Sequence, residues 1–330
     1  MTAPGDFLRV EHLTVSFDVR QSWLGRKKKL KAVDDVSLSI REGEALGIVG
    51  ESGCGKSTLA RAILQLVRAS SGTVVWLGRP IEKLAEHSLR PLRKDLQIIF
   101  QDPLASLDPR MTVGEIIAEP LRVHRPELNR AARRATVASM LSRVGLNPED
   151  INRYPHEFSG GQCQRIGIAR AMVLNPKLLI CDEPVSALDV SIQAQIINLL
   201  RDLRRDQNMT ILFVSHNLAV VRRLCDRVAV LYLGRLMELA SVEDLFATPL
   251  HPYTKGLLAA IPIPDPARQP QRLGTALTGE LPSPMAPPSG CVFRTRCPRA
   301  IDVCAQHVPM LETTDNSNRS IACLRWREPE

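Results

Sequence analysis

Long hydrophobic runs are missing from this sequence of 330 residues. No apolar stretch approaches the roughly 18–20 residues that a helix needs to cross a bilayer. Residues 1–6 also lack the charged and then apolar pattern of a secretory signal peptide. We therefore expect a cytosolic protein, which can still bind a membrane partner.

A concentrated basic face is missing as well, although the net charge is +8. The positive charge is scattered, and its densest run is residues 26–29, near the N-terminus. Proteins that bind nucleic acid typically gather basic residues on one face or along one helix. We interpret the excess charge as a solvated loop beside a phosphate-handling site or a membrane surface, and expect no nucleic-acid partner.

Pairs of the form C-x-x-C are absent, although the chain has eight cysteines. In a cytosolic chain, cysteines argue for free thiols or a metal site rather than for disulfides. Four of them, Cys291, Cys297, Cys304 and Cys323, lie in a tail with too few apolar residues to build its own core. Four thiolates suit a 4Fe–4S cluster or a structural zinc, but the spacing is not that of a standard zinc finger. Unmetallated thiols are the third alternative.

The sequence does contain a phosphate-binding loop. Residues 50–57 match G-x-x-x-x-G-K-[ST], after an apolar run typical of a buried strand and before a predicted helix over 58–64. Its glycines let backbone N–H groups turn inward and bind an anion. Lys56 can reach the β- and γ-phosphates, and the Ser57 hydroxyl can ligate Mg²⁺. The predicted nucleotide contacts are Gly50, Glu51, Ser52, Gly53, Cys54, Gly55, Lys56, Ser57 and Thr58.

Strand and helix patterns alternate around this loop, which predicts an α/β fold. A polar loop is expected over 21–31, and a stretch that is helical by pattern, without a strand signal, over 111–145. We predict a nucleotide domain over 1–250, interrupted by a helical subdomain at about 102–163. A second domain, 251–330, contains a proline-rich linker at 262–290 and the cysteine tail. Strands are expected at 8–17, 32–40, 45–49, 72–77, 96–100, 178–181, 209–214, 228–232 and 235–240.

Polar side chains follow three of the predicted strands. Asp182 and Glu183 end the strand at 178–181, at the edge where ligands collect in α/β sheets. Asp182 can hold Mg²⁺, and Glu183 can polarise the water that attacks the nucleotide. Gln101 can contact the metal or that water, and His216 can hydrogen-bond the γ-phosphate.

A second helix N-terminus suited to anions lies at Ser159, Gly160, Gly161 and Gln162. Ser159 is a good N-cap, and the two glycines open the helix end to an anion. One nucleotide does not need two such sites from one chain. We therefore predict a head-to-tail dimer in which each nucleotide lies between the phosphate loop of one chain and the Ser-Gly-Gly-Gln segment of the other.

This ordered set of motifs resembles the ATPases of ABC transporters. The matching motifs are Walker A at 50–57, the Q-loop at Gln101, the signature at 159–162, Walker B ending in Asp182 and Glu183, the D-loop ending in Asp189, and the switch His216. The resemblance implies a P-loop NTPase fold with an antiparallel β subdomain, ATP and Mg²⁺ as ligands, Glu183 as catalytic base, and a signature that acts on the partner's nucleotide. The family also stacks an aromatic residue on adenine. Trp23 is the candidate, and packing or membrane contact is the alternative for its indole.

Segments outside these motifs resemble the oligopeptide/dipeptide importer ATPases, and more closely their "F" than their "D" partner. They are residues 31–34, 154–158, 184–191, 251–257 and 290–298. The resemblance implies an iron–sulfur cluster at the four tail cysteines, and a position on the cytoplasmic face of the membrane. It also implies a paralogous ATPase subunit, two permease subunits and an external peptide-binding protein as partners. Dipeptides, longer peptides, glutathione and nickel chelates stay open as substrates. A non-transport ABC ATPase and a redox sensor are the alternative functions.

Overall fold

The computed structural model describes residues 6–20, 27–261, 277, 279–314 and 319–328. The chain divides into two compact units, and each is treated by itself. The first unit comprises Met1–Ile40, Leu46–Glu82 and Ser215–Glu330; the second comprises Arg41–Ala45 and Lys83–Val214. Among the described residues, no helix combines the length and the apolar character that a membrane span requires.

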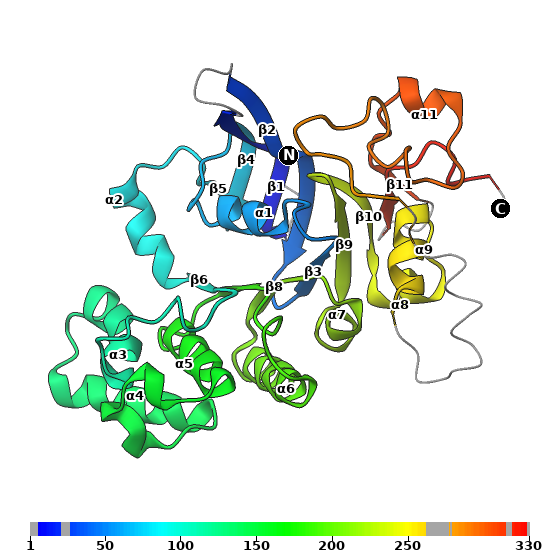
Figure 1. Ribbon diagram of the computed structural model, residues 1–330. Helices are drawn as coiled ribbons and strands as arrows, with labels where there is room; N and C mark the ends of the chain where they lie inside the picture. The colour runs from blue at the N-terminus through cyan, green and yellow to red at the C-terminus, as the bar shows by residue number, and fades with distance from the viewer. Residues whose placement is uncertain (1–5, 21–26, 262–276, 278, 315–318, 329–330) are drawn as a thin grey trace. The chain divides into compact units, whose positions relative to one another are not determined.

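The first unit begins with an antiparallel sheet of strand order β2-β1-β4-β5, drawn in blue and cyan in Figure 1. The strands are β1 (Asp6–Arg20), β2 (Lys27–Arg41), β4 (Ser71–Trp76) and β5 (Arg79–Pro80). The predicted C-terminal boundary of the loop over 21–31 was wrong, because residues 27–31 belong to β2, which begins at Lys27. Lys28 and Lys29 are exposed, and β2 is the outermost strand of this sheet, where lysine is well tolerated.

A second sheet of the first unit carries the phosphate loop. Its order is β11-β12-β10-β9-β3, with β3 parallel to β9 and the other pairs antiparallel. All five residues of β3 are buried, which explains their unbroken apolar sequence. The strands are β3 (Ala45–Val49), β9 (Arg227–Tyr232), β10 (Arg235–Ser241), β11 (Glu312–Thr313) and β12 (Ser320–Ile321).

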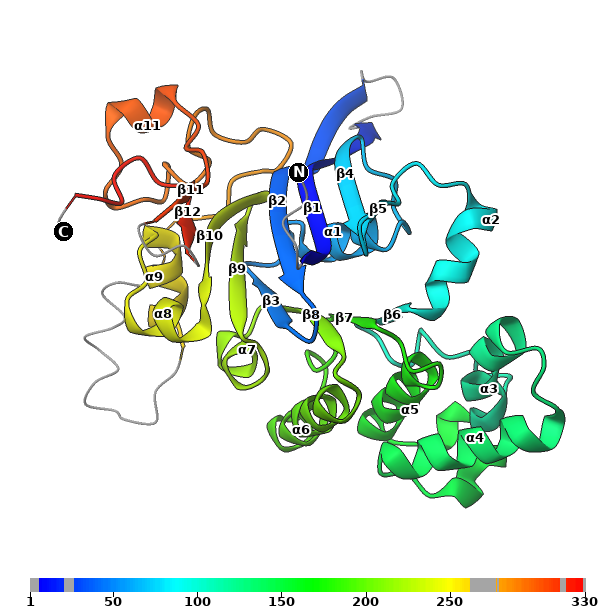
Figure 2. The ribbon, with the colours of Figure 1, turned by 180° about the vertical axis from the view of Figure 1, so that it is seen from behind.

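Among the described residues, the first unit has five helices besides these sheets. They are α1 (Lys56–Ile63), α7 (Leu218–Leu224), α8 (Val242–Ala247), α9 (Pro252–Ala259) and α11 (Asp302–Gln306). Helices α8 and α9 lie beside β10 in both views of the chain (Figures 1 and 2). The segment between α9 and the tail falls largely on residues 262–276 and 278, which lie outside the described residues.

The second unit contains three parallel strands in the order β8-β7-β6. Leu96, Leu178 and Thr210 lie side by side at their starts, so the carboxyl ends of these strands share one edge. The strands are β6 (Leu96–Ile99), β7 (Leu178–Asp182) and β8 (Thr210–Ser215). Ser215, the last residue of β8, belongs to the first unit. This edge positions Gln101 and Glu183.

Helices fill the rest of the second unit, and α3, α4 and α5 pack together (green in Figure 1). Residues 111–145 contain α3 and α4 and no strand, as predicted. A capping box between Thr112 and Glu115 fixes the start of α3. The helices are α2 (Glu86–Leu89), α3 (Val113–His124), α4 (Arg130–Arg143), α5 (Gly160–Met172) and α6 (Val190–Gln207), with short 3-10 turns at Arg90–Lys94, Pro148–Asn152 and Pro155–Glu157.

Candidate nucleotide site

The phosphate loop connects β3 to α1 through backbone that only glycine tolerates. Gly50 has φ 154° and Gly55 has φ 101°. A Cβ on Gly50 would lie 2.1 Å from the carbonyl oxygen of Leu231, and one on Gly55 would lie 2.0 Å from that of Ala32. The glycine spacing that identified the loop in the sequence is therefore dictated by backbone packing.

Lys56 places a positive charge at the N-terminus of α1. Its Nζ donates hydrogen bonds to the carbonyl oxygens of Gly50 and Glu51, each at 2.9 Å, and the residue is buried. The free N–H groups at the start of a helix and its dipole also favour a negative ligand. The loop, the ammonium and the helix end together form an anion site in the first unit.

Glu183 is strained at the carboxyl end of β7. Its φ is 49°, a left-handed conformation that costs a non-glycine residue on the order of 1–3 kcal/mol. Its N–H donates to the carbonyl oxygen of Val214 at 3.0 Å, and its Oε2 accepts a 3.4 Å hydrogen bond from Nε2 of Gln101. The second unit thus brings together two predicted site residues, beside the fully buried Asp182.

The Ser-Gly-Gly-Gln segment forms the exposed N-terminus of α5, a helix of 13 residues. Ser159 Oγ accepts from the Gln162 N–H at 3.4 Å, and Gln162 Oε1 accepts from the Ser159 N–H at 2.9 Å. The predicted N-cap is therefore confirmed as a reciprocal capping box. Asp189, the N-cap of α6, and His216, which follows β8, are exposed. Trp23 lies outside the described residues.

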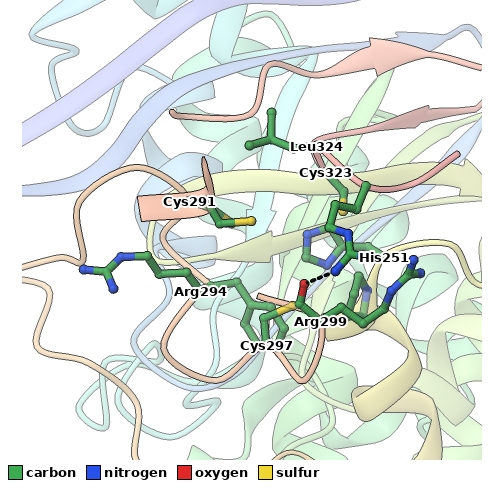
Figure 3. A pocket seen from close by; sticks show the side chains of 11 residues that line it. His251, Cys291, Arg294, Cys297, Arg299, Cys323 and Leu324 are labelled. Atoms are coloured by element: carbon green, nitrogen blue, oxygen red, sulfur yellow. Dashed lines mark hydrogen bonds between the residues drawn. The ribbon is translucent and has the colours of Figure 1, made fainter. Parts of the chain in front are cut away.

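All four tail cysteines line one pocket of the first unit. Cys291 and Cys297 come from the segment before α11, Cys304 from α11, and Cys323 follows β12. Figure 3 shows three of them around the pocket together with His251. The Cys291 N–H donates to the carbonyl oxygen of Cys304 at 2.7 Å, which joins two parts of the segment.

The four thiols are close enough to affect one another, but they do not form a ready mononuclear site. Burial first, and then the neighbouring thiols, raise the pKa of Cys291 to about 11. Within the described residues, no group of three or more His, Cys, Asp or Glu side chains is arranged to hold a metal ion.

His251, which lines the same pocket, is a buried neutral imidazole. Its Nδ1 accepts from the Tyr253 N–H at 3.0 Å and caps α9. Burial lowers the pKa of His251 to about 4. Because the unfolded side chain titrates near 6.5, protonation favours unfolding as the pH falls through the window between these two values.

His251→Asn is expected to flatten the acid dependence of stability. Asparagine retains a capping oxygen but does not titrate. We expect the wild-type free energy of unfolding to fall by about 2 kcal/mol more than that of the variant between pH 7 and pH 5. Urea unfolding at the two pH values measures the difference, and parallel losses in both proteins would contradict the assignment.

A buried lysine and strained glycines between a buried strand and a helix define a P-loop nucleotide-binding protein. The comparisons with known proteins are specific. Residues 33–186 match the ABC transporter family, and residues 237–304 match the oligopeptide/dipeptide transporter C-terminal region. The chain is 56% identical over 321 residues to the oligopeptide transport ATP-binding protein OppF of Salmonella typhimurium, covering 96% of each chain. It is 50% identical over 323 residues to the putative oligopeptide transport ATP-binding protein YkfD of Bacillus subtilis, covering 98% of this chain and 96% of that one.

Solved structures agree with this fold. The ATP-binding cassette MJ0796, in a dimeric structure bound to ADP and Pi, superposes with a TM-score of 0.65 at 29% identity, covering 71% of this chain and 98% of that one. The cassette cbiO1 of Clostridium perfringens gives 0.64 at 28% identity, covering 74% and 92%. The chain belongs to the ATP-binding proteins of the ABC transporter family, in its oligopeptide transport group. The predicted family and the predicted P-loop NTPase fold are confirmed.

Proposed function

We propose that this chain is the ATP-hydrolysing subunit of an importer for dipeptides and oligopeptides. The observation that supports it most is the likeness to oligopeptide transport ATP-binding proteins over 96% of the chain, including the tail. In this proposal residues 1–250 form the ATPase domain, with a helical subdomain at about 102–163, and residues 251–330 form the transporter-specific C-terminal domain.

Each predicted site residue has a role in this proposal. In the first unit, residues 50–58 bind the triphosphate, Lys56 neutralises it, and His216 contacts the γ-phosphate. In the second unit, Glu183 accepts a proton from the water that attacks the γ-phosphorus, so that ATP and water yield ADP and phosphate, and Gln101 positions that water. Ser57 and Asp182 offer the oxygen ligands that Mg²⁺ prefers, and the ion would neutralise phosphate charge.

The signature segment and Asp189 act on the nucleotide of a second subunit. The exposed N-terminus of α5 supports this role, because it offers N–H groups and a helix dipole to an approaching phosphate. The second subunit is a paralogous ATPase. Two permease subunits and an extracytoplasmic peptide-binding protein complete the importer, and the chain lies at the cytoplasmic face of the membrane.

We further propose that the four-cysteine pocket binds a 4Fe–4S cluster. Four cysteine side chains that line one pocket support it, because four cysteine ligands are the donor set that a 4Fe–4S cluster takes. The cluster would brace a tail that has too few apolar residues to build a core of its own.

Cys297→Ser is expected to remove this cluster. Purified without oxygen, the wild-type chain should contain about four irons with matching sulfide, and the variant close to none, because one of four ligands is lost. Cys225→Ser, which changes a buried cysteine outside the tail, is the control and should keep its iron. Unchanged iron in Cys297→Ser, or zinc in the wild type, would contradict the proposal.

Transport in proteoliposomes tests the function itself. The chain is reconstituted with its second ATPase subunit, permease subunits and binding protein, and uptake of a labelled pentapeptide is followed with and without ATP. We expect uptake that requires ATP and stops in Glu183→Gln. Uptake restricted to glutathione or a nickel chelate would change the substrate class, and the absence of ATP-dependent uptake would contradict an importer.

A further inference from the structure

The second residue of the phosphate loop, Glu51, is held by three other side chains of the first unit. Its N–H donates to Tyr253 Oη at 2.9 Å, and its carbonyl oxygen accepts from Lys56 Nζ at 2.9 Å. Its carboxylate accepts two hydrogen bonds from Arg296, at 2.5 and 3.0 Å. Each polar group of Glu51 therefore has a partner, and two of the three partners come from the C-terminal part of the chain.

Arg296 is buried and held in place by a neighbouring aromatic side chain. Its side chain is only 5% exposed, and its guanidinium lies 5.9 Å from the ring centroid of Tyr232. Tyr232 in turn packs edge-on against Tyr253 and Phe293. The hydrogen bonds to Glu51 raise the pKa of Arg296 above its already high value, so the group is charged throughout the pH range of the cell. A bidentate pair of this kind fixes the orientation of the Glu51 carboxylate and also neutralises its charge.

Glu51 brings a negative charge into a loop that binds negative phosphates. Without a positive partner, its carboxylate would repel the nucleotide and would be free to rotate toward the loop. Arg296 removes both effects. It also directly precedes Cys297, so the ion pair joins the four-cysteine segment to the phosphate loop.

We propose that Arg296 is a positioning residue for ATP binding, which neutralises and orients Glu51 and thereby makes the affinity of the phosphate loop depend on the folded four-cysteine segment. This inference rests on the proposed function. A purely structural role would instead resemble that of Arg319, which pairs with Glu238 at 2.7 Å and hydrogen-bonds Thr248.

The test measures the equilibrium binding of ATP to the full chain in EDTA, which prevents hydrolysis. Arg296→Ala is expected to raise Kd about tenfold, because it leaves Glu51 uncompensated. Arg296→Lys keeps the charge but loses the bidentate geometry, so a smaller increase of about threefold is expected, and this variant serves if Arg296→Ala does not fold. Adding Glu51→Gln to Arg296→Ala should restore most of the affinity by removing the repelling charge.

Arg327→Ala is the charge-matched control. It removes one positive charge from an exposed residue of the same tail, packed over Trp326, and its Kd should stay within about twofold of wild type. A Kd for Arg296→Ala equal to that of Arg327→Ala overturns the inference and leaves the proposed function intact. Failure of Glu51→Gln to restore affinity also overturns it, because loss of folding would then explain the defect. A wild-type chain that binds no ATP overturns both.

Discussion

Replacing Glu183 by glutamine is expected to lower kcat for ATP hydrolysis by about 10²–10⁴-fold, the range that a general base typically contributes. Glutamine keeps the length of the side chain and an oxygen that can accept from Gln101, but it does not take a proton from water. ATP binding should persist, because the phosphate loop is unchanged, and the variant should accumulate as a nucleotide-bound dimer. Single-turnover hydrolysis and size-exclusion chromatography with ATP measure the two effects.

Glu243→Gln is the matched control for this experiment. Glu243 is an exposed carboxylate in the first turn of α8, and its replacement should leave hydrolysis at the wild-type rate. Hydrolysis at wild-type speed in Glu183→Gln would show that another group accepts the proton. The strained backbone of Glu183 would then need a different explanation.

Arg319→Ala should be the most damaging of the substitutions for stability. The side chain of Arg319 is 8% exposed and that of its partner Glu238 is 0% exposed. Glu238 also accepts backbone N–H bonds from Leu250 at 3.1 Å and His251 at 3.0 Å, so the carboxylate is fixed in place. Loss of its cation leaves a buried charge uncompensated, which typically costs about 3–5 kcal/mol in the free energy of unfolding.

Urea unfolding measures this loss, with Arg125→Ala as control. Arg125 forms an ion pair with Glu127 in which both side chains are more than half exposed (55% and 58%). Pairs of this kind contribute about 0–1 kcal/mol. Equal losses in the two variants would contradict the prediction, because Glu238 would then tolerate the removal of Arg319 at little cost.

The phosphate loop could be predicted from the sequence because its requirements are local. Two glycines, a lysine and a hydroxyl occupy fixed positions within eight residues, and the backbone of Gly50 and Gly55 shows why no other residue fits. The strand ends at Gln101 and Glu183 followed from apolar runs that stop at a polar residue. The left-handed conformation of Glu183 could not be predicted from the sequence, because glutamate is rarely found in that conformation.

The organisation of the tail was beyond the reach of sequence patterns. Arg296 and Glu51 are 245 positions apart, and no periodicity connects them. Strands β11 and β12 have two residues each, too few to show alternation. The early start of β2 was missed for a different reason, since the residues around Lys28 read as loop by composition, although pairing with β1 makes them a strand.

The pairing of β12 with β10 has a consequence for how the chain avoids self-association. Glu238 and Leu239 of β10 face Ile321 and Ser320, and most of β10 is buried and apolar. A cassette without this tail would leave the edge of β10 unpaired. Unpaired, apolar strand edges are surfaces to which other chains can add strands and aggregate. Strand β12 pairs with two residues of that edge, and β11 and β12 have two residues each, which is too short to template a neighbour. The tail therefore covers part of the β10 edge, whatever its cysteines bind.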